Sequence, residues 1–341
     1  MKTIEAPTTV AALRRRAARR EAGVVAVLAV TALALGVVGL TYGKASVTPA
    51  EVLAAITGRA DAMTGFVILE LRLPRLIAAV VAGACLAVSG ALFQSVLRNP
   101  LVSPDIIGVT QSAATTGAVA LLAFGLGGLA LTGTVIGGTL LAAVLLYVLA
   151  WRDGSGYRLV LVGIGVAAVS AGLVSYVLTR SEVQDAQKVY AWISGSLARA
   201  EWETLVPLLL GAAPLFLITL PLARRLTVLQ LGDDTAGALG VHVRRSRLGL
   251  LAVAVCLAAV AVGVVGPISF VALVSAPIAR RVVGAGAPAL SASALVGAVI
   301  LLASDLVAQF AVPGLTLPAG VVTGVVGAPY LLWLILRSRS A

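Results

Sequence analysis

The chain has 341 residues, of which 60% are hydrophobic and 11% are charged, and its net charge at pH 7 is +11. This composition lies far outside the range of soluble domains, and charge-free runs of helical length leave α-helices as the way to satisfy the backbone in lipid. We therefore expect an all-α, polytopic membrane protein with about ten transmembrane helices. The 25 lysines and arginines outnumber the 14 acidic residues, but they do not cluster on a soluble face, so the charge does not indicate a nucleic-acid partner.

The N-terminal region predicts a basic tail, a first span and a surface helix. Residues 1–22 are polar and rich in arginine, and the apolar run over 23–42 is long enough to cross the bilayer. No small-residue cleavage site stands out, so we interpret the run as a transmembrane helix and not as a signal peptide. Thr48 and Glu51 have the spacing of a capping box, which predicts a short helix that ends near Gly58 and lies on the membrane surface.

The second span, roughly 74–97, is predicted by the 22 residues without a charge that separate Arg75 from Arg98. That length is enough to cross ~30 Å of hydrocarbon. Small residues recur at every fourth position and give one smooth face for close packing against another helix. These residues are Ala79, Gly83, Ala87 and Ala91.

A polar break follows this span. Asn99-Pro100 is expected to end the helix, because the residue before a proline is pushed out of helical geometry. Ser103 is expected to cap the next helix, with Pro104 at its first position and Asp105 in its first turn. A helix that stops and restarts at membrane depth is what a transport pathway needs.

The middle of the chain contains three further spans. Residues 106–151 form a run of 46 residues without a charge, which is too long for one crossing. The glycines within 125–128 predict a turn between spans three and four, and a polar loop at 152–156 precedes span five at 158–179. The segment 180–203 is expected to hold an interfacial helix with aromatic anchors at headgroup depth. The anchors are Tyr190, Trp192 and Trp202.

The second half of the chain alternates spans with short connections. Span six stops at Arg224-Arg225, and a connection over 226–247 follows it. Within this connection, Asp233 can cap a short helix that Gly240 terminates. Span eight is short and broken, between Ser269 and Arg281. The other boundaries are 204–223 for span six, 248–266 for span seven, 288–310 for span nine and 316–336 for span ten.

The distribution of charge predicts the orientation. With the N-terminus inside, 18 of the 25 lysines and arginines lie on the cytoplasmic side and the other seven lie outside, as the positive-inside rule requires. The chain then divides into a cytoplasmic tail over 1–22, a transmembrane domain over 23–336 and a cytoplasmic tail over 337–341. The expected location is the cytoplasmic (inner) membrane.

The chemistry that the sequence lacks narrows its function. A single histidine, His242, cannot form a histidine metal cluster or a His-based triad, and no Gly-x-x-x-x-Gly-Lys-Ser/Thr phosphate loop is present. Asp105 and Asp305 are the only carboxylates within the predicted spans, whereas a proton-driven carrier more often shows a buried relay. Cys85 and Cys256 both lie in apolar spans and are interpreted as packing residues. The energy source is therefore expected on another subunit.

Eight short motifs follow one another along the chain. They are Leu-Arg-Leu-Pro-Arg (71–75), Gly-Ala-x-Leu-Ala-x-Ser-Gly-Ala-x-x-Gln (83–94), Arg-Asn-Pro-Leu-x-x-Pro-Asp-Ile-Ile-Gly (98–108), Trp-x-x-Gly-Ser-Leu (192–197), Leu-Gly-Asp-Asp-x-Ala-x-x-Leu-Gly (231–240), Gly-Pro-Ile-Ser-Phe-Val (266–271), Ile-Ala-Arg (278–280) and Leu-Pro-Ala-Gly-Val-Val-Thr (317–323). With them the chain resembles, over about 45–336, the permeases of iron-siderophore, haem and vitamin B12 ABC importers. It looks most like the ferric-enterobactin type.

This resemblance implies a type II ABC importer permease fold with ten helices per subunit. It also implies two permease subunits around a central pathway, two cytoplasmic ATPase subunits and an external substrate-binding protein. ATP and Mg²⁺ would bind to the ATPase, and no cofactor or metal is expected in this chain.

The resemblance also implies roles for individual residues. Arg72 and Arg75 match arginines that receive acidic residues of the binding protein. Asn99 and Leu101 match positions of the cytoplasmic gate, and we assign Pro100 and Asp105 to the same pathway. The segment 231–241 matches the helix that couples to the ATPase. Its candidate coupling residues are Gly232, Asp233, Asp234, Ala236, Leu239 and Gly240.

Two departures from the family pattern affect these expectations. Ala276-Pro277 stands where many members have Pro-His, which can shift the kink in span eight by one residue. Gln309 stands where many members carry a third docking arginine. We therefore expect the second permease subunit to be non-identical, with an identical one as the alternative.

Each assignment has a simpler alternative. Arg72 and Arg75 could be anchors that snorkel to the interface, Asn99-Pro100 could be a plain helix end, and the 231–241 helix could be an ordinary connection. Asp105 is more simply a stabiliser of a helix N-terminus, and Asp305 is expected to pair with a neighbouring helix.

Our functional prediction is an importer permease for a ferric siderophore. A secondary transporter driven by an ion gradient is the alternative. A membrane enzyme is disfavoured, because the sequence offers no evident pair of nucleophile and base.

Overall fold

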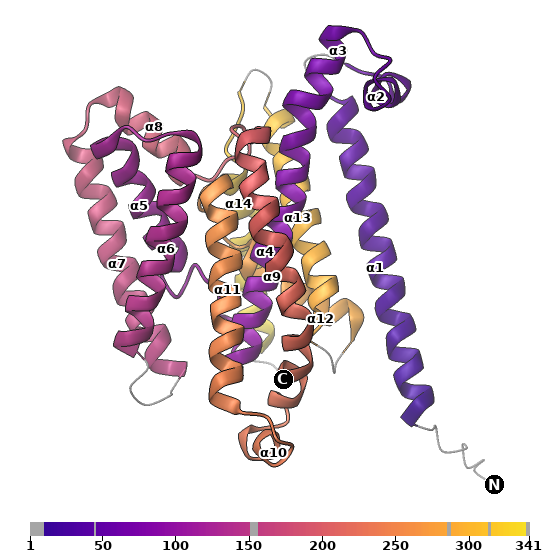
Figure 1. The fold of residues 1–341 in the computed structure, drawn as a ribbon, viewed down its shortest axis with the longest axis vertical. Coiled ribbons are helices and arrows are strands. Elements are labelled where there is room, and N and C mark those ends of the chain that lie inside the picture. Colours follow the sequence, from indigo (N-terminus) through magenta and orange to yellow (C-terminus); the bar gives the residue numbers. More distant parts are fainter. Residues whose placement is uncertain (1–9, 44–45, 151–155, 285–287, 313–314, 339–341) are drawn as a thin grey trace.

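The computed structural model describes residues 10–43, 46–150, 156–284, 288–312 and 315–338, and the regular secondary structure within these ranges is helical (Figure 1). Seven helices there are long and apolar enough to cross a membrane by length and composition. They comprise α1 (Val10–Thr41), α4 (Leu73–Val96) together with the helical segment that precedes it from Ala62, α6 (Gly128–Ala150), α7 (Gly156–Arg180), α9 (Trp202–Leu229), α11 (Val243–Val265) and α13 (Leu290–Phe310). With the shorter α5 (Val109–Phe124), α12 (Val271–Val283) and α14 (Ala319–Ser338), they match the ten predicted spans.

Helix α4 is the centre of the molecule and packs against α9, α11, α12 and α13. The predicted small-residue face makes this possible. A Cβ added at Gly83 would collide with the backbone of Gly297 in α13, and one added at Gly90 would collide with the carbonyl of Ala272 in α12. The smooth face therefore brings two neighbouring backbones into contact, as expected for small residues in a membrane helix.

Helices α5, α6, α7 and α8 (Val183–Ile193) form a group beside the α4-centred bundle (Figure 1). The predicted turn between spans three and four is confirmed. Gly125 and Gly128 both have positive φ, at 60° and 52°, a conformation that glycine adopts without steric cost. Of the predicted loop at 152–156, residues 152–155 lie outside the described residues, and Gly156 is the first residue of α7.

The two ends of the molecule carry different short helices (Figure 1). One end, called the α2 end below, has α2 (Pro49–Ile56), α3 (Ala62–Phe66), the π-helix η1 (Val67–Arg72) and α8. The opposite end, called the α10 end, has α10 (Asp233–Ala238) and the start of α1. Span lengths and short helices thus agree with the predicted order of crossings.

The capping box before α2 is confirmed. The backbone N–H and the hydroxyl of Thr48 both donate to Oε2 of Glu51, at 2.7 and 2.8 Å, and the N–H of Glu51 donates back to that hydroxyl. These bonds to the charged form hold the pKa of the Glu51 carboxyl below its usual value. The signal was reliable because all its parts lie within four residues.

Two helices extend past the predicted spans. Helix α1 begins at Val10, so much of the basic tail is helical and continuous with the first span. Helix α9 does not stop at Arg224-Arg225 but continues to Leu229, where Leu226 and Leu229 are buried. In both places the helix extends past the hydrophobic stretch, because exposed arginines are compatible with helical backbone.

The aromatic-anchor interpretation holds for the exposure of Tyr190 but is wrong for Trp192. Tyr190 is 61% exposed, whereas Trp192 is 6% exposed and packs its ring against Gly117 of α5. Trp202 is partly buried and donates its indole N–H to the carbonyl of Leu69 at 2.9 Å. Both tryptophans therefore join elements within the chain.

Candidate functional site

The break between α4 and α5 is longer than predicted. Helix α4 ends at Val96, and Arg98 has a φ of 50°. The hydroxyl of Ser103 accepts the N–H of Ile106 at 3.4 Å, but this produces only a turn. Regular helix resumes at Val109, because Gly108 has a φ of 82°, which a right-handed helix cannot accommodate.

Asp105 is therefore not in the first turn of α5, and its predicted role as a helix stabiliser is wrong. Its Oδ1 accepts the hydroxyl of Thr110 at 2.7 Å, and its Oδ2 accepts the backbone N–H of Phe270 at 3.3 Å. Phe270 lies just before α12 and has a φ of 69°. The Asp105 carboxylate thus joins the start of α5, just after the α4–α5 break, to the segment that precedes α12.

Three motifs meet close to this junction through backbone contacts. The N–H of Ser196 donates to the carbonyl of Val265, and the N–H of Gly320 donates to the carbonyl of Gly195. A Cβ at Gly266 would lie 2.6 Å from the carbonyl oxygen of Trp192. Glycines at these points allow three chain segments to approach at backbone distance, which explains why the motifs contain them.

The predicted gate residues lie at the α10 end. Asn99, Pro100 and Leu101 are all exposed, and the side chain of Asn99 accepts the N–H of Leu101 at 2.9 Å. Next to them, the guanidinium of Arg98 donates to the carbonyl of Leu229 at 2.8 Å. This contact ties the break to the end of α9, where the chain turns into α10.

Helix α10 is fixed by a charge network that sequence reasoning missed. Asp233 accepts Arg98 at 2.9 Å and Arg247 of α11 at 2.8 Å. Gly232, with a φ of 108°, occupies the N-cap position, so the prediction that Asp233 caps α10 was wrong. Asp233 acts instead as the acceptor that joins the α4–α5 break, α10 and α11.

The candidate coupling residues face different ways. Ala236 is fully buried within the chain, so its side chain supports α10 and offers no surface to a partner. Leu239 is 61% exposed and Asp234 is exposed. Gly240 ends the helix with a φ of 80°, as predicted. The apolar surface of this segment therefore includes Leu239 and Leu231, which is 62% exposed, but not Ala236.

At the α2 end, Arg75 is engaged within the chain. Its Nε and Nη2 donate to the two carboxylate oxygens of Asp305 at 2.9 and 2.8 Å, which confirms that Asp305 pairs with a neighbouring helix. Gln309 donates its amide to the same carboxylate at 2.7 Å. Arg72 donates to the carbonyl of Leu40 at 2.6 Å. Both arginines are partly buried, so each would offer only part of its side chain to an acidic residue of a binding protein.

A second buried polar contact also escaped sequence reasoning. The side chain of Gln94 lies in α4 and accepts the guanidinium of Arg280 at 2.5 Å, while its amide donates to the carbonyl of Leu273 at 2.9 Å. The contact joins α4 to both ends of α12. A polar residue inside a long apolar run was the available signal, because such a group needs a partner in lipid.

Comparisons with known proteins agree with this arrangement. Residues 30–337 match the model of the FecCD transport family. The chain is 40% identical over 307 residues to the ferric enterobactin transport system permease protein FepG of Escherichia coli (strain K12), a match that covers 89% of this chain and 92% of that protein. It is 37% identical over 314 residues to the achromobactin transport system permease protein CbrC of Dickeya dadantii (strain 3937), covering 90% of this chain and 89% of that protein.

A solved structure shows the same fold. It is an inward-facing conformation of a metal-chelate type ABC transporter, with a TM-score of 0.77 and 30% sequence identity, and the match covers 93% of this chain and 99% of that chain. The predicted all-α permease fold is thereby confirmed.

Proposed function

Because the chain belongs to the FecCD transport family, we propose that it is the permease subunit of an ATP-driven importer that carries a ferric siderophore across the cytoplasmic (inner) membrane. Two similar proteins bear the names of siderophore transport permeases, for enterobactin and achromobactin. The location and the multi-pass character are consistent with the apolar helices described above.

The observation that carries the proposal is α10. A short helix held by two arginines, with an exposed leucine beside it, has the form of a docking element for a separate protein. Because this helix is tied through Arg98 to the α4–α5 break, a force applied to it would reach the pathway. We propose that one ATPase subunit binds to α10 of each of two permeases. ATP and Mg²⁺ would bind to the ATPase subunits.

The remaining partners follow from the same orientation. We propose that the α10 end and both termini lie in the cytoplasm, a hypothesis supported by the excess of basic residues expected on that side. The external binding protein is placed at the α2 end, near Arg72 and Arg75. A second permease, expected to be non-identical, completes the pathway.

Replacing Leu239 by Asp tests the docking of the ATPase. A charge placed in an apolar contact costs several kcal/mol when it is buried without a partner, so co-purification of the ATPase with the permease should fall at least tenfold. Leu53→Asp is the matched control, because Leu53 is 64% exposed on α2 at the other end. Equal recovery of the ATPase from both variants would contradict the role of α10.

Transport in proteoliposomes distinguishes an ATP-driven importer from a secondary transporter driven by an ion gradient. Uptake of a ferric siderophore by the assembled complex should require ATP on the α10 side and should persist when ion gradients are collapsed. Uptake by the permease alone, driven by a proton or sodium gradient, would support the alternative.

A further inference from the structure

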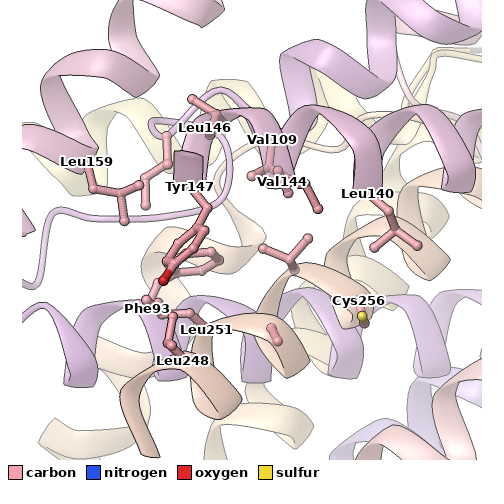
Figure 2. A pocket seen from close by; sticks show the side chains of 14 residues that line it. Phe93, Val109, Leu140, Val144, Leu146, Tyr147, Leu159, Leu248, Leu251 and Cys256 are labelled. Atoms are coloured by element: carbon pink, nitrogen blue, oxygen red, sulfur yellow. The ribbon is translucent and has the colours of Figure 1, made fainter. Parts of the chain in front are cut away.

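An apolar groove of about 480 Å³ lies between α6 and α11, and residues of α4, α5 and α7 complete its walls (Figure 2). Its lining is hydrocarbon except for the hydroxyl of Tyr147 and the thiol of Cys256. Figure 2 shows the ring of Tyr147 extending from α6 towards Phe93 and Leu251. The volume falls within the range of small-molecule sites in proteins, about 300–1,000 Å³.

The groove lies at the depth of the lipid chains. Both α6 and α11 are membrane-spanning helices by length and composition, and Val144 on the groove wall is 59% exposed. The solvent at this depth is the hydrocarbon of the bilayer. An acyl chain that enters the groove would exchange contacts with other chains for contacts with side chains on several sides, which favours a bound lipid through closer packing.

Two arginines of α11 precede the groove on the side of α10, the end proposed to be cytoplasmic. Leu248 and Ala252 line the groove from one face of α11. Because residues three and four positions apart share a helix face, Arg244 and Arg245 lie on the same face one turn earlier, and both are exposed. Arg247 lies elsewhere on the helix and pairs with Asp233. Long arginine side chains at this position can extend to the headgroup region.

We propose that this groove binds one anionic phospholipid, with an acyl chain between α6 and α11 and the phosphate against Arg244 and Arg245. Basic pockets between transmembrane helices on the cytoplasmic side are a known way to recognise anionic headgroups. The groove reaches the α4–α5 break at Ile107, contains no residue of α10, and does not depend on which substrate the protein carries.

Native mass spectrometry of the full chain in detergent, titrated with phosphatidylglycerol or phosphatidylcholine, tests the charge recognition. The wild type should retain one phosphatidylglycerol and bind phosphatidylcholine more weakly. The double variant Arg244→Gln, Arg245→Gln should lose roughly thirtyfold in affinity for phosphatidylglycerol, from about 1 kcal/mol for each arginine near the surface. The matched control Arg15→Gln, Arg16→Gln removes the same charge from α1 at the same end and should leave binding unchanged.

A second pair of variants tests the groove itself. Ala252→Phe places a ring in the groove and should abolish retention of both lipids, whereas Ala213→Phe on the exposed side of α9 should have no effect. Equal binding of the two lipids by the wild type, or full retention by Ala252→Phe, would overturn the proposal. A third result would also overturn the proposal: neither the wild type nor the Ala252→Phe variant carries lipid, and the substitution separates two copies of the chain. The groove would then be a subunit interface.

Discussion

The Arg75–Asp305 pair joins α4 to α13 with a fork-to-carboxylate geometry that a lysine could not reproduce. The side chain of Asp305 is 6% exposed and that of Arg75 is 20% exposed. Any external carboxylate that approaches Arg75 would therefore compete with one that is already bound. If Arg75 docks the binding protein, a carboxylate of that protein must compete with Asp305 for the Arg75 guanidinium.

Variants of the two residues should consequently change docking in opposite directions. Arg75→Gln should weaken association of the binding protein, and Asp305→Asn should strengthen it by about 1 kcal/mol, or roughly fivefold, because a competing negative charge is removed. The measurement is binding-protein affinity for the permease–ATPase complex in nanodiscs at low salt. A loss of affinity in both variants would indicate that the pair acts only as a structural support.

The same pair should contribute to stability. Removing one partner of a largely buried ion pair leaves a charge without compensation, and Asp305→Asn should lower the free energy of unfolding by about 2–4 kcal/mol. The double variant Arg75→Gln, Asp305→Asn should recover part of this loss. Thermal unfolding in detergent is the measurement, and a double variant less stable than Asp305→Asn alone would contradict the interpretation.

Sequence reasoning predicted that Asp305 needs a partner but could not identify it. Residues 75 and 305 are 230 positions apart, so no local pattern connects them. The burial of Trp192 was missed for a similar reason, because its contact with Gly117 depends on how α8 crosses α5. An aromatic residue in a polar segment has the same local signature at an interface and in a core.

At the scale of elements, the glycine contacts of α4 give the clearest prediction. Gly90→Ala should destabilise the protein by about 1–3 kcal/mol, since the added methyl group collides with the backbone of α12 and rigid backbone cannot move aside cheaply. Gly133→Ala on α6 is the control, because nothing lies within 4 Å of its added Cβ. It should be neutral or stabilising by roughly 0.5–1 kcal/mol. Equal unfolding temperatures for the two variants would show that α4 and α12 separate easily.

The positions of the breaks could be predicted better than their extents. Asn99-Pro100 correctly marked the end of α4, because the effect of proline acts on its immediate neighbour. The restart was placed too early, at Ser103, since the sequence shows a capping serine but not the positive φ of Gly108. The link from Asp105 to Phe270 depends on tertiary structure and had no local signal.

At the scale of the whole molecule, the order and number of spans were predicted well from hydropathy and charge, because lipid forces each apolar run into a helix. The arrangement of the α5–α8 group beside the α4-centred bundle was not predicted (Figure 1). Apolar faces on membrane helices do not reveal which of them meet protein and which meet lipid.

The assembly of two different permeases is a prediction at this scale. Gln309 donates a neutral amide to Asp305, at the position where an arginine would add positive charge to the α2 end. Two copies of this chain would present a weaker positive rim than a pair with one additional arginine. This permease expressed with its ATPase and binding protein alone should therefore not reach the ligand-stimulated transport of the complete system. Full transport from the homodimer would contradict the prediction.

The loose attachment of α1 has a consequence for the order of synthesis. Only 6% of the residues in the apolar stretch of α1 are buried. The main partner of α1 is α13, which begins about 250 residues after α1 ends. At roughly 5–20 residues per second, the ribosome needs on the order of ten to fifty seconds to produce α13 after α1 has emerged. Val27, Val30 and Leu33 are each at least 66% exposed, so α1 can remain in the bilayer as a single inserted helix throughout that interval without exposing polar groups to lipid.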